Sequence, residues 1–223
     1  MNNLTPLPRS FYKPPADVVA RKLLGHWLIR ISPEGACGGP IVEVEAYLSD
    51  DPACHGAVGP TKRNRVMFGP PGYAYVYFIY GCHFCVNAVC RPAGIAEAVL
   101  IRAVEPLFGE NIMRSRRRVP ARPALTNGPA KLCEGMGIDS ALAASDLCDA
   151  GSALFIARNP SLAQFRKQRG PVVTTVRIGI TQAAALPLRF YLSNSPFVSS
   201  GAKGAKAAGK QAILRRRGQP APA

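Results

Sequence analysis

Acidic residues are scarce in this chain and stop altogether after Asp149. The 223 residues include 28 Lys and Arg against 13 Asp and Glu, which gives a formal net charge of +15 at pH 7. The imbalance lies in the second half, since residues 1–110 hold 10 basic and 9 acidic residues and residues 111–223 hold 18 and 4. Such asymmetry indicates a polyanionic partner, most often nucleic acid, with an anionic membrane surface as the alternative.

The chain also lacks any apolar run close to the ~18–20 residues that a membrane span needs. Its N-terminus, Met1 to Pro8, has neither the basic start nor the apolar core of a secretory signal peptide. We therefore expect no membrane role and a cytoplasmic protein, associated with the nucleoid if it is bacterial. The length of 223 residues, 48% of them hydrophobic, suits one large domain with a sizeable core.

Seven cysteines without a secretory signal do not indicate a disulfide framework, because their number is odd. Cys82 and Cys85 have C-x-x-C spacing, which is found in redox pairs and in half of a zinc site. The chain has no second C-x-x-C and no His pair at zinc spacing, and on a strand these two positions point to opposite faces. We expect buried thiols, with no metal and no cofactor.

Hydrophobic periodicity predicts an α+β fold around a mixed or antiparallel sheet. A helix is expected over residues 14–25, with Pro in its first turn and Gly25 at its end. Strands are expected at residues 27–31, 41–47, 73–80, 84–89, 99–104, 174–180 and 188–193. Residues 111–136 alternate a basic helix with a Pro-rich loop. We predict one domain over residues 1–200 and, from its Gly/Ala/Lys-rich composition, a disordered basic tail over 201–223.

Two carboxylates stand inside the expected strand from Ile41 to Tyr47, which Gly38-Gly39-Pro40 bounds before it. Glu is depleted in strands and is rarely buried unless it is paired. Because side chains alternate along a strand, Glu43 and Glu45 should share one face. Such a pair marks either a solvent-facing edge or an active site.

The residues that follow this strand favour a site that binds an acidic and aromatic ligand. His55 comes after the strand, then the basic segment Thr61 to Arg65, then four tyrosines between residues 73 and 80. The predicted strands at residues 73–80 and 84–89 form a β-hairpin with Gly81 at its turn. A nucleobase on a phosphate backbone fits this combination.

The motifs occur in a recognisable order along residues 15 to 200. They are Ile41 to Leu48, His55, Arg63-Asn64-Arg65 with Met67-Phe68, Tyr75-Val76-Tyr77, Tyr80-Gly81, Phe84-Cys85, Asn87, Leu100 to Ala103 with Glu105-Pro106, Gly128-Pro129, Lys131-Leu132 and Pro187 to Tyr191. Together they resemble the alkyladenine (3-methyladenine) DNA glycosylases, of the type that is not helix-hairpin-helix. The resemblance implies a curved sheet with surrounding helices and a protruding β-hairpin.

The resemblance also implies an activity. An enzyme of this family flips an alkylated or deaminated purine out of double-stranded DNA and hydrolyses its N-glycosidic bond, as a step of base excision repair. Glu45 matches the general base that activates a water, and Arg102 matches the arginine beside it. No lysine matches a nucleophile, so a monofunctional enzyme is expected, acting as a monomer.

The resemblance also implies which residues bind the substrate. Tyr47, His55 and Tyr77 match the pocket walls that stack on the flipped base, where a cationic base gains from aromatic faces. Asn87 matches the residue that excludes normal guanine, and its alternative is a hydrogen-bonded core Asn. Tyr80 matches the wedge that fills the gap in the duplex, and its alternative is the end of a core strand.

Arg63, Arg65 and Lys131 are expected to contact phosphates, although charged runs are often only solvated. The chain departs from the family pattern at the wedge tip, where Cys82 and His83 replace larger residues. The preferred lesion and the role of Glu43 stay open.

Two rival hypotheses remain. A nucleic-acid-binding module of related fold would have no chemistry and a dispensable Glu45. A glycosidase of polysaccharides would use Glu43 and Glu45 as paired acids and would need no strong positive charge.

Overall fold

The computed structural model describes residues 4–199, so the predicted tail of residues 201–223 lies outside the described residues. Within 4–199 there are eight strands: β1 (Trp27–Ser32), β2 (Gly35–Tyr47), β3 (Ala74–Ile79), β4 (His83–Cys90), β5 (Glu97–Val104), β6 (Leu154–Ala157), β7 (Val172–Thr175) and β8 (Arg189–Leu192). The α-helices of this part are α1 (Ala16–Leu23), α2 (Glu110–Arg116), α3 (Pro129–Met136) and α4 (Leu162–Arg169). All strand pairs between residues 4 and 199 are antiparallel, which confirms the predicted α+β class.

The strands form one sheet in the order β3-β4-β5-β2-β1-β6, with β8 added to β2 and β7 added to β8. β2 organises this sheet because its two halves have different neighbours. Residues 35–40 pair with β1, whereas residues 43–45 lie between β5 and β8. The second half of β2 is therefore an interior strand, and Glu43 and Glu45 are fully buried. The alternative of a solvent-facing edge is wrong.

The predicted start of this strand is also wrong, because β2 runs straight through Gly38, Gly39 and Pro40. These glycines permit close backbone contact rather than a turn. A Cβ atom on Gly38 would lie 2.2 Å from the Leu28 carbonyl oxygen, and one on Gly39 would lie 1.9 Å from the Glu105 carbonyl oxygen. Both positions therefore need glycine inside the strand.

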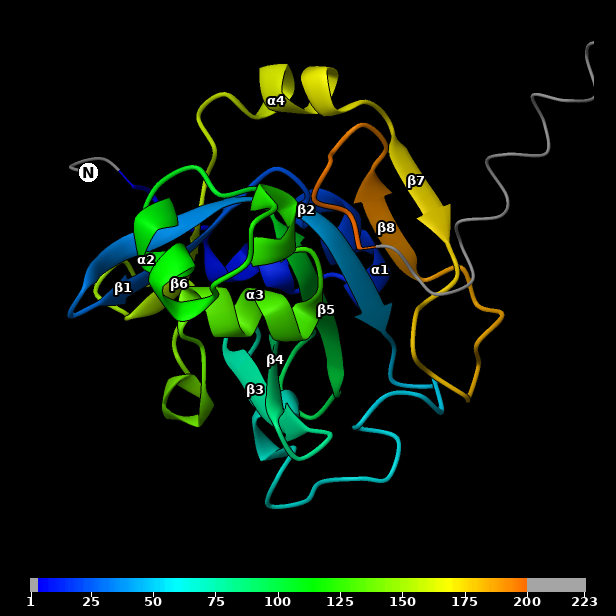
Figure 1. Ribbon diagram of the computed structural model, residues 1–223. Helices are drawn as coiled ribbons and strands as arrows, with labels where there is room; N and C mark the ends of the chain where they lie inside the picture. The colour runs from blue at the N-terminus through cyan, green and yellow to red at the C-terminus, as the bar shows by residue number, and fades with distance from the viewer. Residues whose placement is uncertain (1–3, 200–223) are drawn as a thin grey trace, which may run out of the picture.

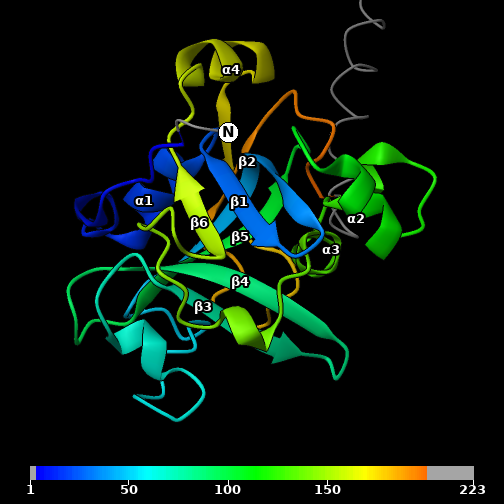
Figure 2. The ribbon, with the colours of Figure 1, turned by 90° about the vertical axis from the view of Figure 1, so that its left-hand side faces the viewer.

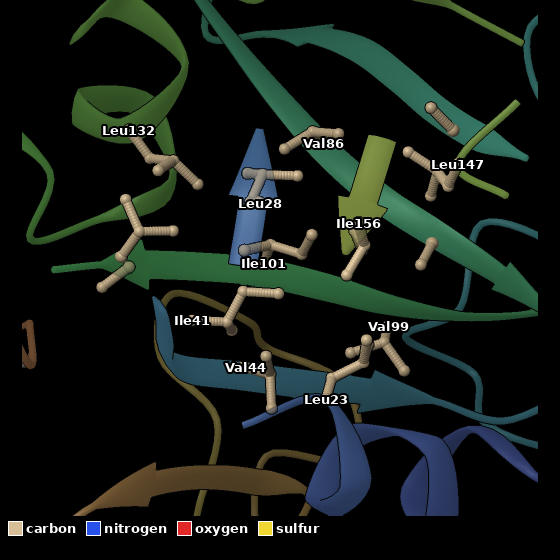
Figure 3. Packing of buried hydrophobic residues seen from close by; sticks show 14 of the residues in the cluster. Leu23, Leu28, Ile41, Val44, Val86, Val99, Ile101, Leu132, Leu147 and Ile156 are labelled. Carbon is tan, nitrogen blue, oxygen red and sulfur yellow. The ribbon is translucent and has the colours of Figure 1, made fainter. Parts of the chain in front are cut away.

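The hydrophobic core covers one face of the sheet. Val44 of β2, Val86 of β4 and Ile101 of β5 pack there together with Leu23 of α1 and Leu132 of α3 (Figure 3). α1 forms as predicted, although it begins at Ala16, after the two prolines, and ends at Leu23. α1 and α3 thus cover the core face of the sheet. Because side chains alternate along a strand, every second side chain points to the other face.

β3 and β4 form the predicted hairpin, paired from Ala74 opposite Ala88 to Ile79 opposite His83. Residues 80–82 make the turn. The hairpin lies at the lower end of the molecule in Figure 1, and its turn extends away from the rest of the sheet in Figure 2. The protruding hairpin is therefore confirmed.

The last part of the chain differs most from the expectation. β6 and α4 were not predicted, and the predicted strand over residues 174–180 ends at Thr175. The alternation of Val176, Arg177 and Ile178 looks strand-like, but the Ile178 amide donates to the Glu45 carboxylate instead of to a neighbouring strand. α4 lies above the sheet at the top of Figure 1.

Every helix between residues 4 and 199 falls short of the length and apolar character that a bilayer-spanning helix needs.

Candidate active site

A pocket of about 380 Å³ opens on the face of the sheet opposite the core. Side chains of β2, β3, β4 and β5 line it, together with the segments at residues 53–55 and 178–180. The structure brings seven predicted residues together here: Glu45, Tyr47, His55, Tyr77, Tyr80, Asn87 and Arg102. Strand alternation explains this, since β2 sends Val44 and Ala46 to the core and Glu45 and Tyr47 to the pocket.

Glu45 accepts three interactions from groups that are far apart in the chain. Its Oε1 lies 3.1 Å from Nη1 of Arg102 and accepts the Ile178 amide over 2.8 Å. Its Oε2 accepts the Tyr47 hydroxyl over 3.0 Å. A carboxylate oxygen can accept two hydrogen bonds, and among residues 4–199 Tyr47 is the one donor to Oε2, so this oxygen keeps an acceptor position for a further donor.

Glu43 has a different environment, because β2 is irregular on both sides of it. The pairing with β5 shifts register between Ile41 and Glu43 and again between Glu43 and Val44. Such β-bulges re-aim side chains. Glu43 does not line the pocket, and its carboxylate binds Arg102 and Arg189 instead, at 2.8 and 2.7 Å. Glu43 therefore lies outside the pocket lining, although it shares Arg102 with Glu45.

Two buried acids and two arginines balance one another beneath the pocket. Burial by itself raises the pKa of Glu43, but Arg102, Arg189 and the Ser199 backbone and hydroxyl groups outweigh it and lower that pKa below its usual range. Burial likewise opposes the charge of Arg102, yet Glu45 and Glu43 raise its pKa above the ordinary value. Arg102 is thus a fixed cation that bridges both carboxylates.

Aromatic rings form the pocket wall across from Glu45. The His55 and Tyr77 rings meet edge to face at 4.6 Å, and the Tyr75 and Tyr77 rings lie 5.3 Å apart. Burial raises the pKa of Tyr77 and of Tyr47, and it raises that of Tyr75 to about 12. These tyrosines therefore keep their protons at neutral pH.

Tyr75 was not among the predicted site residues, although it stands two positions before Tyr77 on the same strand face. Its hydroxyl lies 2.9 Å from Nδ1 of His55. Burial and the nearby Arg63 lower the pKa of His55, so the ring is neutral at pH 7. The imidazole therefore presents one acceptor and one donor rather than two donors.

Asn87 is a hydrogen-bonded core residue that also forms part of the pocket lining. It is buried, and its side-chain amide donates to the Tyr75 carbonyl over 3.0 Å, as a core Asn would. It also lines the pocket. The amide is thus held in a fixed orientation at the pocket surface.

Tyr80 stands at the hairpin turn and is 76% exposed. It is not the end of a core strand. Its φ of 54° and the φ of 70° at Gly81 are both left-handed, a conformation that a tyrosine adopts only at a cost. The turn therefore projects this ring outward at the pocket mouth.

The three predicted phosphate contacts lie outside the pocket lining. Arg65 and Lys131 are exposed, and Lys131 donates to the Asn127 side chain over 3.0 Å. Arg63 lies over the Tyr77 ring, 5.5 Å from its centroid, and donates to the Phe78 carbonyl. Arg63 thus also braces an aromatic wall.

Sequence reasoning missed the loop that closes the pocket beside Glu45. Ile178, Gly179 and Ile180 line it, and the buried Arg177 just before them pairs with the buried Asp51. Asp51 is 126 residues away in the chain, so local patterns gave no signal for this pair. The apolar alternation around Arg177 even suggested a strand.

The chain was compared with known proteins. Residues 10–196 match the family model described as methylpurine-DNA glycosylase. A protein of Carboxydothermus hydrogenoformans is 47% identical over 193 residues, which cover 86% of this chain and 98% of that protein. One from Methanoculleus marisnigri is 48% identical with the same coverage. One from Rubrobacter xylanophilus is 48% identical over 75% of this chain and 84% of that protein. All three carry the name 3-methyladenine DNA glycosylase as a provisional assignment. The chain belongs to the methylpurine-DNA glycosylase family.

Proposed function

We propose that this protein is a monofunctional DNA glycosylase that removes alkylated or deaminated purines from double-stranded DNA. The observation that carries the proposal is the Glu45 carboxylate, buried at the wall of an aromatic pocket with one acceptor position of Oε2 free. The pocket volume of about 380 Å³ lies in the ~300–1,000 Å³ range of small-molecule sites. Family membership supports the same activity.

In this mechanism a water donates one hydrogen bond to Oε2 of Glu45. As the bond between C1′ of the deoxyribose and the purine nitrogen breaks, its electron pair leaves with the base, and the sugar gains oxocarbenium character. The water oxygen attacks C1′ while its proton passes to Glu45. The negative charge of the carboxylate also stabilises the developing cation. Arg102 and the Ile178 amide hold the other oxygen in place.

Recognition of the base is assigned to the pocket walls. A flipped purine would stack on Tyr47, Tyr77 and His55, and each aromatic face adds roughly 0.5–2 kcal/mol for a cationic base. Neutral His55 uses Nδ1 for the Tyr75 hydroxyl, so it would offer Nε2 to the base, as a donor or an acceptor according to its tautomer. Asn87, fixed by the Tyr75 carbonyl, would oppose the exocyclic amine of normal guanine.

Binding of the duplex is assigned to the surface around the pocket mouth. Tyr80 would fill the gap left by the flipped nucleotide, which costs a few kcal/mol to unstack. Arg63, Arg65 and Lys131 would contact phosphates and set the register of the protein on DNA.

Covalent catalysis is not part of the proposal, because no lysine lines the pocket among residues 4–199. Borohydride should therefore trap no adduct between the protein and lesion DNA, and chelator should leave activity intact. A trapped adduct would mean that an amine attacks the sugar.

The paired-acid alternative loses support, since Glu43 lies outside the pocket lining and is bound by two arginines. An assay of base release distinguishes the proposed enzyme from a binding module that has no chemistry. Duplexes that each carry one lesion (3-methyladenine, hypoxanthine or ethenoadenine) are incubated with the protein, and released base is measured.

Glu45→Gln decides whether the carboxylate is the general base. We expect base release to fall by at least 100-fold, because loss of a general base typically costs 10²–10⁴ in rate. Affinity for a duplex with an abasic analogue should stay within a few-fold. Glu34→Gln, a change at an exposed acid, is the control and should behave like the wild type. Turnover of Glu45→Gln within tenfold of the wild type would reject the assignment.

A further inference from the structure

The buried ion pair of Arg177 and Asp51 stands directly behind the proposed catalytic group. Both side chains are almost fully buried, at 0% and 1% exposure. The contact is bidentate: Nη1 of Arg177 donates to Oδ2 of Asp51, and Nη2 donates to Oδ1 over 3.1 Å. Bidentate pairs fix orientation as well as charge. A pair this deep in the protein costs desolvation energy, so a role beyond stability is expected.

Arg177 joins three segments around Glu45. Its Nη1 also donates to the Ala46 carbonyl over 3.1 Å, near the C-terminal end of β2. Asp51 belongs to the segment that leads to His55, and its Oδ1 accepts the Ala53 amide over 3.0 Å. The next residue after Arg177 is Ile178, whose amide binds Oε1 of Glu45. One side chain thereby sets the relative position of the strand, the His55 segment and the closing loop.

Arg177 also supports the Tyr47 ring. Its guanidinium carbon lies 4.6 Å from the ring centroid. Tyr47 lines the pocket and Arg177 does not, so the cation lies against the side of the ring that faces away from the pocket. The Tyr47 hydroxyl in turn donates to Oε2 of Glu45. Two of the three groups that hold Glu45 are thus attached to Arg177.

We infer that Arg177, oriented by Asp51, is a positioning residue that fixes Tyr47 and the Ile178 amide against Glu45. Arg177 lies outside the pocket lining, so it would touch neither the base nor the sugar. The inference rests on the proposed function, since it concerns how the Glu45 carboxylate is aimed. Small misplacements of a reacting group can cost two orders of magnitude in rate.

Two variants separate positioning from folding. Arg177→Lys keeps a charge beside Asp51, but a single ammonium cannot hold Asp51 at two points, bind Ala46 and stack on Tyr47 together. The double variant Asp51→Asn/Arg177→Gln removes both charges and so leaves no unpaired buried ion. The matched control is the bidentate pair of Arg169 and Glu105, outside the pocket, altered to Arg169→Lys and to Glu105→Gln/Arg169→Gln.

Three measurements are made on each full-length variant, after thermal unfolding has shown it to be folded. For both Arg177 variants we expect single-turnover base excision to fall at least tenfold. Affinity for an abasic-analogue duplex should stay within threefold, because that ligand has no base to stack on Tyr47. Without any DNA, hydrogen exchange of the Ile178 amide, followed by NMR, should speed up at least tenfold. The Arg169 variants should leave excision, duplex affinity and Ile178 exchange unchanged.

Excision within twofold of the wild type together with unchanged Ile178 exchange would overturn the inference. Loss of folding in both Arg177 variants would overturn it as well, since the pair would then be required by the fold rather than by the site. The exchange measurement needs no activity. A wild-type protein that releases no base would therefore reject the proposed function, while the exchange result would still decide whether Arg177 holds the Ile178 amide.

Discussion

Glu43 and Glu45 show how far the environment of one side-chain type can differ within three residues of a strand. Both are fully buried and both contact Arg102. Glu43 is enclosed by arginines and Ser199, which suits a charge that must be neutralised. Glu45 is held by one cation and two hydrogen-bond donors and faces the pocket. The first carboxylate supports the second by sharing and orienting Arg102.

His26 makes a prediction about stability. It is buried, and its Nδ1 lies 3.3 Å from the Asn159 amide. Burial, helped by Arg166 and Arg158, lowers the pKa of His26 to about 4. The unfolded chain therefore binds more protons than the folded one between pH 6.5 and about 4, so the free energy of unfolding should fall as the pH drops through this range. The contribution of His26 is at most roughly 3 kcal/mol.

Urea unfolding between pH 7 and pH 4.5 tests this effect. The His26→Gln variant should show a flatter decline than the wild type, although His55 contributes in the same direction because its pKa is also lowered. His83→Gln, a change at an exposed histidine, should keep the full decline. An equal pH dependence in wild type and His26→Gln would contradict the burial argument.

At the scale of elements, the β3–β4 hairpin is built to present its turn. Its paired residues alternate between the core and the pocket, so the strands anchor it firmly. The turn instead holds Tyr80 in a left-handed conformation with most of its surface exposed. Backbone strain of this kind is kept mostly at functional positions. Cys82 and His83, also exposed, complete a tip that is small and polar.

Tyr80→Ser tests the hairpin as a wedge. Single-turnover excision from a fully paired duplex should fall at least tenfold, because the ring no longer fills the vacated stack. Excision of a lesion that is already unpaired should change little, since less unstacking is needed. Leu107→Ser, which removes another exposed apolar side chain, is the control. An equal loss on both substrates would mean that Tyr80 only packs against its surroundings.

At the scale of the whole molecule, charge is distributed unevenly between the pocket and the rest of the chain. Around Glu45 the buried charges are balanced, with Glu43 and Glu45 set against Arg102 and Arg189. The net charge of +15 therefore comes from elsewhere, including the six basic residues of the segment 201–223. This separation suits a protein that is drawn to DNA by a general positive field but selects its target in a neutral pocket.

Deletion of residues 201–223 tests the contribution of that segment. It holds Lys203, Lys206, Lys210, Arg215, Arg216 and Arg217 and no acidic residue. Each charge that neutralises a phosphate adds about 0.9 to the slope of log affinity against log salt concentration. The deletion should flatten this slope and weaken binding to damaged and undamaged duplexes alike. Single-turnover excision at saturating enzyme should not change.

An unaltered salt slope after the deletion would show that these residues do not contact DNA. A slower excision step would show instead that the segment reaches the active site.

Elements whose pattern is local can be predicted from the amino-acid sequence alone. Apolar and aromatic runs predicted β3, β4 and β5, and the alternation of side chains along a strand placed Glu45 on the face opposite Val44. The ordered motifs determined the family, which the comparisons confirmed. These features depend on near neighbours in the chain, so one sequence suffices to find them.

Features that depend on distant contacts become visible only in the folded chain. The bulge that turns Glu43 toward Arg189, the backbone contacts that require Gly38 and Gly39, and the pairing of Arg177 with Asp51 each join segments that lie far apart in the chain. Local periodicity carries no information about such partners. For this reason local periodicity wrongly predicted a strand over residues 176–180. The Ile178 amide is bound by a carboxylate 133 residues away rather than by a neighbouring strand.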